Sequence, residues 1–167
     1  MVYTIISGTN RADSYTERVA RTYQDKLQIK GIEASVFSLK DLDVLNRNES
    51  FIEKESSILI PTNKFIFIIP EYNGSYPGVL KALIDNSDIK KTWWWKKALL
   101  TGVSSGRAGN LRGMDHLVGT LQYLKMIVHP NKLPISIVET LFDEKEILSH
   151  TPTSDAIDTQ LQEFVDF

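Results

Sequence analysis

Residues 65–86, "FIFIIPEYNGSYPGVLKALIDN", pass from an unbroken apolar run through a polar turn into a segment with helical period. The run Phe65–Ile69 lacks polar alternation, which is typical of a strand that is buried on both faces of a sheet. Pro70 has no N–H and is expected to end the strand. Asn73-Gly74 suits a left-handed turn, and Pro77 fits the first turn of a helix. The stretch therefore predicts a strand, a loop and a helix in succession.

The same alternation of β-rich runs and helical stretches extends along the chain. Five strands are expected, at Val2–Ile6, Glu33–Phe37, Phe65–Ile69, Ala98–Gly102 and Met126–Val128, the last with an extension at Ile135–Val138. Helical stripes are formed by Val19, Ala20, Tyr23 and Leu27, and by Ile157, Leu161, Phe164 and Val165, with a further helix around Ile52–Ile60. The pattern predicts an α/β fold with a doubly wound, five-stranded parallel sheet and helices on both faces. A single domain is expected to span residues 1–167.

Composition narrows the classes of function. The formal net charge of −2 gives no field that would attract nucleic acid or an anionic membrane. The chain has no cysteine, which excludes disulfides, thiolate catalysis and cysteine-ligated metal sites. Redox chemistry would therefore have to come from a cofactor. No signal peptide or membrane-spanning stretch is recognisable, so a cytoplasmic protein is expected.

The first loop of interest reads "SGTNRADSYTERVA", residues 7–20. Ligands of open parallel sheets bind beyond the carboxyl ends of the strands, where this loop lies. Its hydroxyls, the guanidinium of Arg11 and the free amides of a helix start suit a monophosphate, because the triphosphate and dinucleotide glycine patterns are absent. An alternative is that Ser14 and Glu17 form an ordinary capping box, and for these two residues both interpretations stay open.

Two later loops would lie at the same edge of the sheet. Glu71, Tyr72 and Asn73 follow the third strand, where an aromatic ring could stack and its heteroatoms be bound. The loop "GVSSGRAGNLRG", residues 102–113, contains glycines that let backbone amides approach the edge of a bound ring. Taken alone, this third loop is more typical of a flexible surface segment than of a binding site.

The three loops together resemble the NADPH-dependent FMN reductase family. Residues 7–20 resemble its phosphate loop, "PEYNGSYPGVLKALID" (70–85) its PEYN-x-S-x-PG-x-LKN-x-ID signature, and "SSGRAGNLR" (104–112) its SPG-x-x-GG-x-R segment. The resemblance extends from the first strand to about Met126 and fades in the C-terminal third. It implies a flavodoxin-like fold and bound FMN. The implied FMN-binding residues are Thr9, Arg11, Ser14, Thr16, Pro70, Glu71, Tyr72, Asn73, Ser104, Ser105, Gly106 and Gly109.

The resemblance also implies an activity. Family members include quinone, azo-dye and chromate reductases, so the chain is expected to pass hydride from NAD(P)H through the flavin to a small acceptor such as a quinone, free flavin, azo compound or chromate. No catalytic acid or base is assigned, because the flavin carries the chemistry. A flavodoxin-type electron carrier and a non-catalytic flavin-binding module remain alternatives. The near-neutral charge disfavours the carrier.

Some residues depart from the family pattern or stay open. Asn110 stands where the family often has glycine, and Ala82 and Asn86 also differ from the signature. Arg107 and Arg112 could meet the 2′-phosphate of NADPH or lie in solvent.

Other conspicuous residues suggest roles away from the loops. His116, His129 and His150 lack metal-ligand spacing, so no metal site is expected. The run Trp93-Trp94-Trp95 suggests local packing, a wall over the flavin, or a subunit interface in a homodimer or homotetramer. The acidic stretch 142–146 is expected to begin a solvated helix.

Overall fold

The computed structural model describes residues 1–145 and 147–167. Its strands are β1 (Tyr3–Ser7), β2 (Ala34–Ser38), β3 (Lys64–Pro70), β4 (Lys97–Val103), β5 (Ile127–Val128) and β6 (Leu133–Ile135). Its helices are α1 (Tyr15–Ile29), α2 (Glu49–Lys54), α3 (Gly78–Asn86), α4 (Leu111–Tyr123) and α5 (Thr151–Asp166), with short π or 3-10 turns at η1 (Glu55–Leu59), η2 (Ile89–Trp93) and η3 (Val138–Thr140). None of the helices in the described part of the chain is long and apolar enough to cross a membrane.

The strands form one parallel sheet in the order β2-β1-β3-β4-β5, with β6 also paired to β4. This order is that of flavodoxin-like folds, so the predicted α/β class and parallel sheet are confirmed. The predicted strands agree with the structure to within one or two residues. The structure differs from the prediction at Pro70, which is still the last residue of β3. The amide of Glu71, the next residue, donates to Val103 O at 2.9 Å.

The fifth position of the sheet is divided between two short strands. β5 pairs with Lys97–Ala98 of β4, and β6 pairs with Thr101–Val103. Between them, Nε2 of Gln160 in α5 donates to the carbonyls of Leu100 (3.0 Å) and Asn131 (2.8 Å). A side chain from a helix thus takes over hydrogen bonding that an uninterrupted strand would provide.

The side-chain oxygen of Gln160 is hydrogen-bonded as well. Oε1 of Gln160 accepts from the hydroxyls of Tyr23 (2.6 Å) and Thr101 (3.1 Å).

The predicted strand extension at Ile135–Val138 is wrong beyond Ile135, because Ile137 has a φ of 47° and starts the turn η3.

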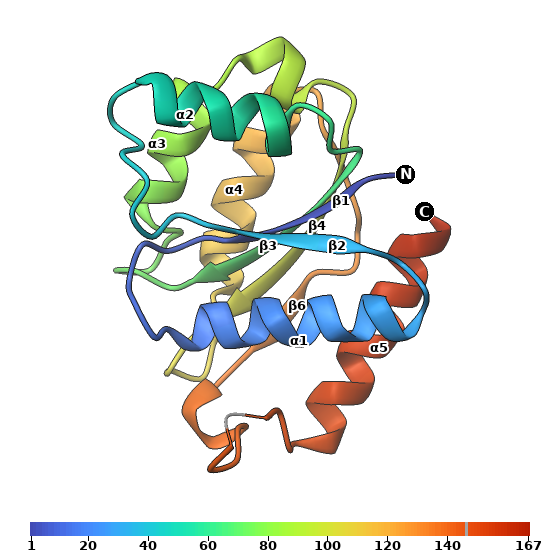
Figure 1. Cartoon of the computed structure of the whole chain (residues 1–167). Helices are drawn as coiled ribbons and strands as arrows, with labels where there is room; N and C mark the ends of the chain where they lie inside the picture. The colour runs from blue at the N-terminus through green and yellow to red at the C-terminus, as the bar shows by residue number, and fades with distance from the viewer. Residues whose placement is uncertain (146) are drawn as a thin grey trace.

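Two hydrophobic clusters cover the two faces of the sheet. Phe65, Phe67 and Ile69 of β3 pack into the cluster shared with α2, α3 and α4. Ile66 and Ile68 pack into the cluster shared with α1 and α5. Figure 1 shows α2, α3 and α4 above the sheet and α1 and α5 below it. The strand is apolar throughout because successive side chains point into opposite layers, both of which exclude water.

The helix predicted at Ile52–Ile60 begins earlier and changes its winding. Asn48 caps α2 by accepting from the amide of Phe51 at 2.9 Å. The helix continues into the π turn η1, where the buried carboxylate of Glu55 pairs with Arg47 at 2.5 Å and accepts from Thr92 Oγ1 at 3.0 Å. Glu55 therefore ties this turn to η2.

The acidic stretch 142–146 does not begin a helix where the structure describes it. Residues 142–145 form a bridge and a turn, and Glu146 lies outside the described residues. Oδ1 of Asp143 accepts from the amides of Lys145 and Ile147, both at 2.9 Å. Such local bonds favour a turn over a helix, and α5 begins only at Thr151.

The three tryptophans have three different environments. Trp93 is fully buried, with its ring centroid 5.1 Å from that of Phe65. Trp94 is half-buried beneath Lys125, whose Nζ lies 3.8 Å from the ring centroid. Trp95 is 68% exposed. Local packing therefore accounts for Trp93, whereas Trp95 leaves a large apolar surface on the outside.

Candidate functional site

A cavity of about 400 Å³ lies at the carboxyl edge of the sheet. It brings together residues from all three loops that the sequence singles out. Those predicted residues are Arg11, Ser14, Thr16, Pro70, Glu71, Tyr72, Ser104 and Ser105. Thr9, Asn73, Gly106 and Gly109 do not line it. We call this space the first cavity.

The first and second loops are joined at Tyr72. Thr9 Oγ1 and the hydroxyl of Tyr72 share a hydrogen bond of 2.6 Å, and the amide of Arg11 donates to the same Thr9 oxygen at 3.2 Å. The guanidinium carbon of Arg11 lies 4.1 Å from the centroid of the Tyr72 ring. Thr9 is 1% exposed, so it positions Tyr72 and Arg11 from behind the wall of the cavity.

The start of α1 supplies hydroxyls to the cavity. Ser14 Oγ accepts from the amide of Glu17 at 3.2 Å, so Ser14 acts as the helix cap. The carboxylate of Glu17 pairs with Arg21 at 3.1 Å and does not line the first cavity. Thr16, which is buried, does line it. The carboxylate in the first turn of the helix therefore leaves the cavity side of α1 to hydroxyl groups.

The second loop ends in a tight two-residue turn. Asn73 and Gly74 have φ angles of 52° and 77°, and the backbones of Tyr72 and Ser75 exchange hydrogen bonds of 2.9 and 3.1 Å. Positive φ at both central positions is the type I′ geometry, which asparagine and glycine favour. Asn73 therefore serves the turn that holds Tyr72. Pro77 precedes α3 as its cap residue rather than lying in its first turn.

The third loop is closed by its own hydrogen bonds. Ser104 Oγ donates to Gly106 O at 2.8 Å and accepts from the amide of Gly109 at 3.0 Å. Gly109 has a φ of 55°, and a Cβ there would lie 2.5 Å from Cβ of Pro134. Gly106 and Gly109 thus shape the loop, while Ser105 faces the cavity.

Asn110 connects the third loop to the end of β3. Its Nδ2 donates to the carbonyls of Ile69 (3.0 Å) and Pro70 (2.9 Å), and the residue is fully buried. Its φ is 59°, a left-handed conformation that asparagine adopts more readily than most residues. Asparagine can therefore stand where the family often has glycine, and its side chain adds two hydrogen bonds that glycine could not make.

Sequence reasoning missed part of the cavity wall. Ala12, Asp13, Tyr15, Val103, Val138 and Glu139 also line it. The amide of Val138 donates to Ser104 O, and that of Ile137 to Gly106 O, both at 3.1 Å. The segment around Val138 could have been predicted, because a strand that pairs with β4 in parallel must end at the same edge of the sheet as β4. Placing that end correctly would have pointed to the segment after Ile135.

The two arginines of the third loop lie apart from the first cavity. Neither Arg107 nor Arg112 is among the described residues that line it. A Cβ added to Gly74 would lie 3.2 Å from Nη1 of Arg112, so that guanidinium packs against the Asn73–Gly74 turn. The described residues also contain no group of three or more His, Asp or Glu side chains that could hold a metal ion.

Comparison with known proteins finds matches over most of this chain. The family model for NADPH-dependent FMN reductase matches residues 1–139. An NAD(P)H-dependent FMN reductase from Pseudomonas aeruginosa is 34% identical over 116 residues, which cover 66% of this chain and 62% of that protein. The alignment thus spans less than two thirds of that reductase.

Two further relatives have lower sequence identity. A 2-hydroxy-1,4-benzoquinone reductase from a Burkholderia species is 24% identical over 137 residues, covering 74% of this chain and 72% of that enzyme. The flavoenzyme NAD(P)H:(acceptor) oxidoreductase from Paracoccus denitrificans has a similar structure, with a TM-score of 0.81 at 21% identity over 99% of this chain and 94% of that one. The likeness to the solved structure shows the fold, and the family model matches most of the sequence. The chain therefore belongs to the NADPH-dependent FMN reductase family.

Proposed function

We propose that this chain binds FMN in the first cavity and acts as an NAD(P)H-dependent oxidoreductase that reduces a small acceptor such as a quinone. The observation that carries the proposal is the convergence of three loops on one space of about 400 Å³. That volume lies within the usual range for small-molecule sites, roughly 300–1,000 Å³. The names of the relatives in Pseudomonas and Burkholderia support the same activity.

The residues present fit a phosphate monoester at one end of the cavity. Arg11 supplies a guanidinium, and Ser14 and Thr16 supply hydroxyls at the start of α1. The amides of a helix start and the helix dipole favour an anion there. Arg11 stacks on Tyr72, which Thr9 fixes, so the cation is oriented before any ligand contact. Thr9 is therefore proposed as a positioning residue for the phosphate group.

The residues fit a flat ring system at the other end. Tyr72, Val103 and Val138 offer aromatic and apolar surface, and the backbones of the second and third loops offer polar groups. When bound, the flavin supplies the acceptance and donation of hydride. The chain's own contribution is to orient that group and to stabilise charge with fixed donors. Ser105 is proposed to face the ring edge, and Asn110 holds the two loops at a fixed separation.

The alternatives differ in what they require of the surface. A one-electron carrier for protein partners commonly has a strongly acidic surface, whereas this chain has a formal net charge of −2. A non-catalytic flavin-binding module would share the cavity and lack turnover. The reductase is favoured because the curated relatives of this chain carry reductase names.

We also propose that the protein is cytoplasmic and assembles as a homodimer or homotetramer. A groove of about 530 Å³ between α3 and α4 is lined in part by Ile84, Ile89 and Tyr123. The side chain of Tyr123 is 81% exposed and that of Trp95 68% exposed. Exposed aromatic residues of this kind are enriched in protein interfaces. Light scattering at several protein concentrations would measure the oligomeric state.

The cofactor assignment is tested by FMN titration of Arg11→Ala. Loss of a charge-assisted hydrogen bond should weaken FMN by about 1.5–3 kcal/mol, or roughly 10- to 150-fold in Kd. Arg107→Ala removes an arginine that does not line the cavity and should leave Kd unchanged. Quenching of flavin fluorescence measures both. An unchanged affinity for FMN in Arg11→Ala would mean that Arg11 is a surface residue that does not bind the phosphate.

The activity is tested with the flavin-loaded protein. Steady-state oxidation of NADPH with a small quinone should proceed without any protein partner. A loaded protein that fails to turn over would end the enzyme assignment and favour the binding module. Turnover that depends on an added carrier protein would favour the electron carrier.

A further inference from the structure

The wall of the first cavity carries an uneven distribution of charge. Among the described residues that line it, Arg11 is the one cation, and the residues with carboxylates are Asp13, Glu71 and Glu139. Arg11 and Asp13 belong to the loop before α1, where the phosphate group is proposed to bind. Glu71 and Glu139 instead border the third loop, at the end that is proposed to hold the ring.

Backbone hydrogen bonds place these two glutamates on opposite sides of the third loop. On the side of β3, the amide of Glu71 donates to Val103 O at 2.9 Å. On the side of β6, the amide of Val138 donates to Ser104 O at 3.1 Å, and Glu139 follows Val138 in the turn η3. Val103 and Ser104 are adjacent in the chain. A ligand that rests on this part of the loop therefore has a carboxylate-bearing residue on each side.

The protein itself does not neutralise either glutamate. Within the described part of the chain, neither Glu71 nor Glu139 forms an ion pair. Glu139 is exposed, and Glu71 is partly exposed. Both charges therefore act on a molecule that enters the cavity, with a strength that solvent and dissolved salt reduce.

The proposed cofactor takes up the compensating cation. Arg11 is held over the ring of Tyr72, with its guanidinium carbon 4.1 Å from the ring centroid, and is proposed to bind the phosphate group. A phosphate monoester brings about two negative charges of its own at neutral pH. An acceptor that arrives afterwards meets the carboxylates, and no other cation is present among the described lining residues. An anionic acceptor is therefore repelled, whereas an uncharged or cationic acceptor is not.

We propose that Glu139, together with Glu71, makes the first cavity select uncharged or cationic flat acceptors over anionic ones. The inference rests on the proposed function, because it names the class of acceptor that the reductase takes. Quinones without acidic substituents belong to this class, whereas sulfonated azo dyes, carboxylated quinones and chromate do not. Val103 and Val138 lie beside the carboxylates and offer apolar surface that suits an uncharged ring.

The same charges are compatible with the nicotinamide cosubstrate. The nicotinamide ring of NAD(P)H is uncharged and becomes a cation when it gives up a hydride, so neighbouring carboxylates do not repel it in either state. The phosphate groups of the cosubstrate are separated from that ring by a ribose. Glu139 is therefore expected to discriminate among acceptors without excluding the source of the hydride.

The test measures acceptor reduction in the absence of NAD(P)H. Flavin-loaded protein is reduced by light and mixed in a stopped-flow instrument with a naphthoquinone 2-sulfonate or with the uncharged 2-sulfonamide of similar size. Flavin absorbance gives a second-order rate constant for each quinone. The ratio of the sulfonate constant to the sulfonamide constant should rise about 5-fold in Glu139→Gln and further in Glu139→Lys. Intrinsic differences between the two quinones cancel, because every protein receives the same pair.

A matched control removes a carboxylate at the opposite edge of the sheet. Glu33 directly precedes β2, and parallel strands begin at a common edge, so Glu33→Gln should leave the ratio unchanged. Added salt should raise the ratio in the wild type, because it screens the repulsion of the sulfonate. Glu71→Gln should also raise the ratio, which provides a second measurement if a Glu139 variant does not hold FMN.

The possible outcomes separate the inference from the proposed function. An unchanged ratio in the variants of both glutamates, or a wild-type ratio that does not respond to salt, would overturn the inference. The reductase assignment would survive either result. Reduced wild-type protein that fails to pass electrons to the uncharged sulfonamide would instead refute the reductase assignment.

Discussion

Asn110 is expected to contribute to stability in two separable ways. Its amide donates to two carbonyls at the end of β3, at 3.0 and 2.9 Å, and its backbone has a φ of 59°. Asn110→Gly keeps the backbone conformation accessible and removes both bonds, which should lower the free energy of unfolding by about 1–3 kcal/mol. Asn110→Ala also places a Cβ in the left-handed region, which should cost about 1–2 kcal/mol more.

The comparison of the two variants isolates each contribution. Urea denaturation followed by circular dichroism gives the free energy of unfolding, provided that the slope m is the same for all three proteins. FMN titration should show weaker binding in both variants, because the second and third loops lose their connection. If Asn110→Gly is as stable as the wild type, the two amide bonds contribute nothing. If the alanine and glycine variants are equally stable, the left-handed backbone imposes no demand.

Three further perturbations test other parts of the structure. Tyr72→Phe removes the hydrogen bond to Thr9 and should lower the free energy of unfolding by about 0.5–1.5 kcal/mol in urea titrations, with weaker FMN binding. Gln160→Leu leaves the carbonyls of Leu100 and Asn131 without this donor and should cost at least about 2 kcal/mol; a thermal midpoint equal to that of the wild type would contradict this. Burial lowers the pKa of Lys96 from 10.5 to about 8, so the unfolded chain binds more protons between these values and stability should rise with pH across that range, a rise that Lys96→Met should abolish.

The sequence predicted the central part of the sheet well, for a local reason. Phe65–Ile69 is apolar throughout and is followed by a proline, an Asn-Gly turn and a second proline, and each of these has a strong backbone preference. The structure places these residues in β3 and the following turn almost as expected. Since parallel strands end at a common edge, the loops that converge on the first cavity could be predicted as well.

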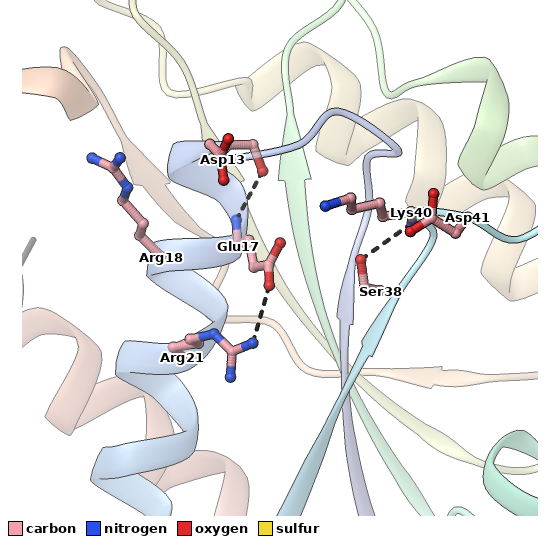
Figure 2. A pocket seen from close by; sticks show the side chains of 8 residues that line it. Asp13, Glu17, Arg18, Arg21, Ser38, Lys40 and Asp41 are labelled. Atoms are coloured by element: carbon pink, nitrogen blue, oxygen red, sulfur yellow. Dashed lines mark hydrogen bonds and ion pairs between the residues drawn. The ribbon is translucent and has the colours of Figure 1, made fainter.

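What the sequence did not reveal depends on contacts between distant segments. Gln160 looks like an ordinary polar residue of an amphipathic helix, and its role requires knowing that β4 lacks a continuous partner at Leu100. Thr9 was expected to touch a ligand, whereas its contact with Tyr72, distant in the sequence, buries it. A cavity of about 440 Å³ arises where the end of β2 meets α1 (Figure 2), and neither segment alone suggests it.

β5 and β6 share the fifth position of the sheet, and the two short strands have different roles. β5 pairs with the start of β4, far from the first cavity. β6 leads directly into the segment that places Val138 and Glu139 in the wall of the first cavity. Because β3 and β4 pair directly with each other, a change confined to residues 136–140 would leave the pairs that set their register untouched. Such a change would reshape the wall of the first cavity around Val138 and Glu139 while the sheet beneath it stays the same.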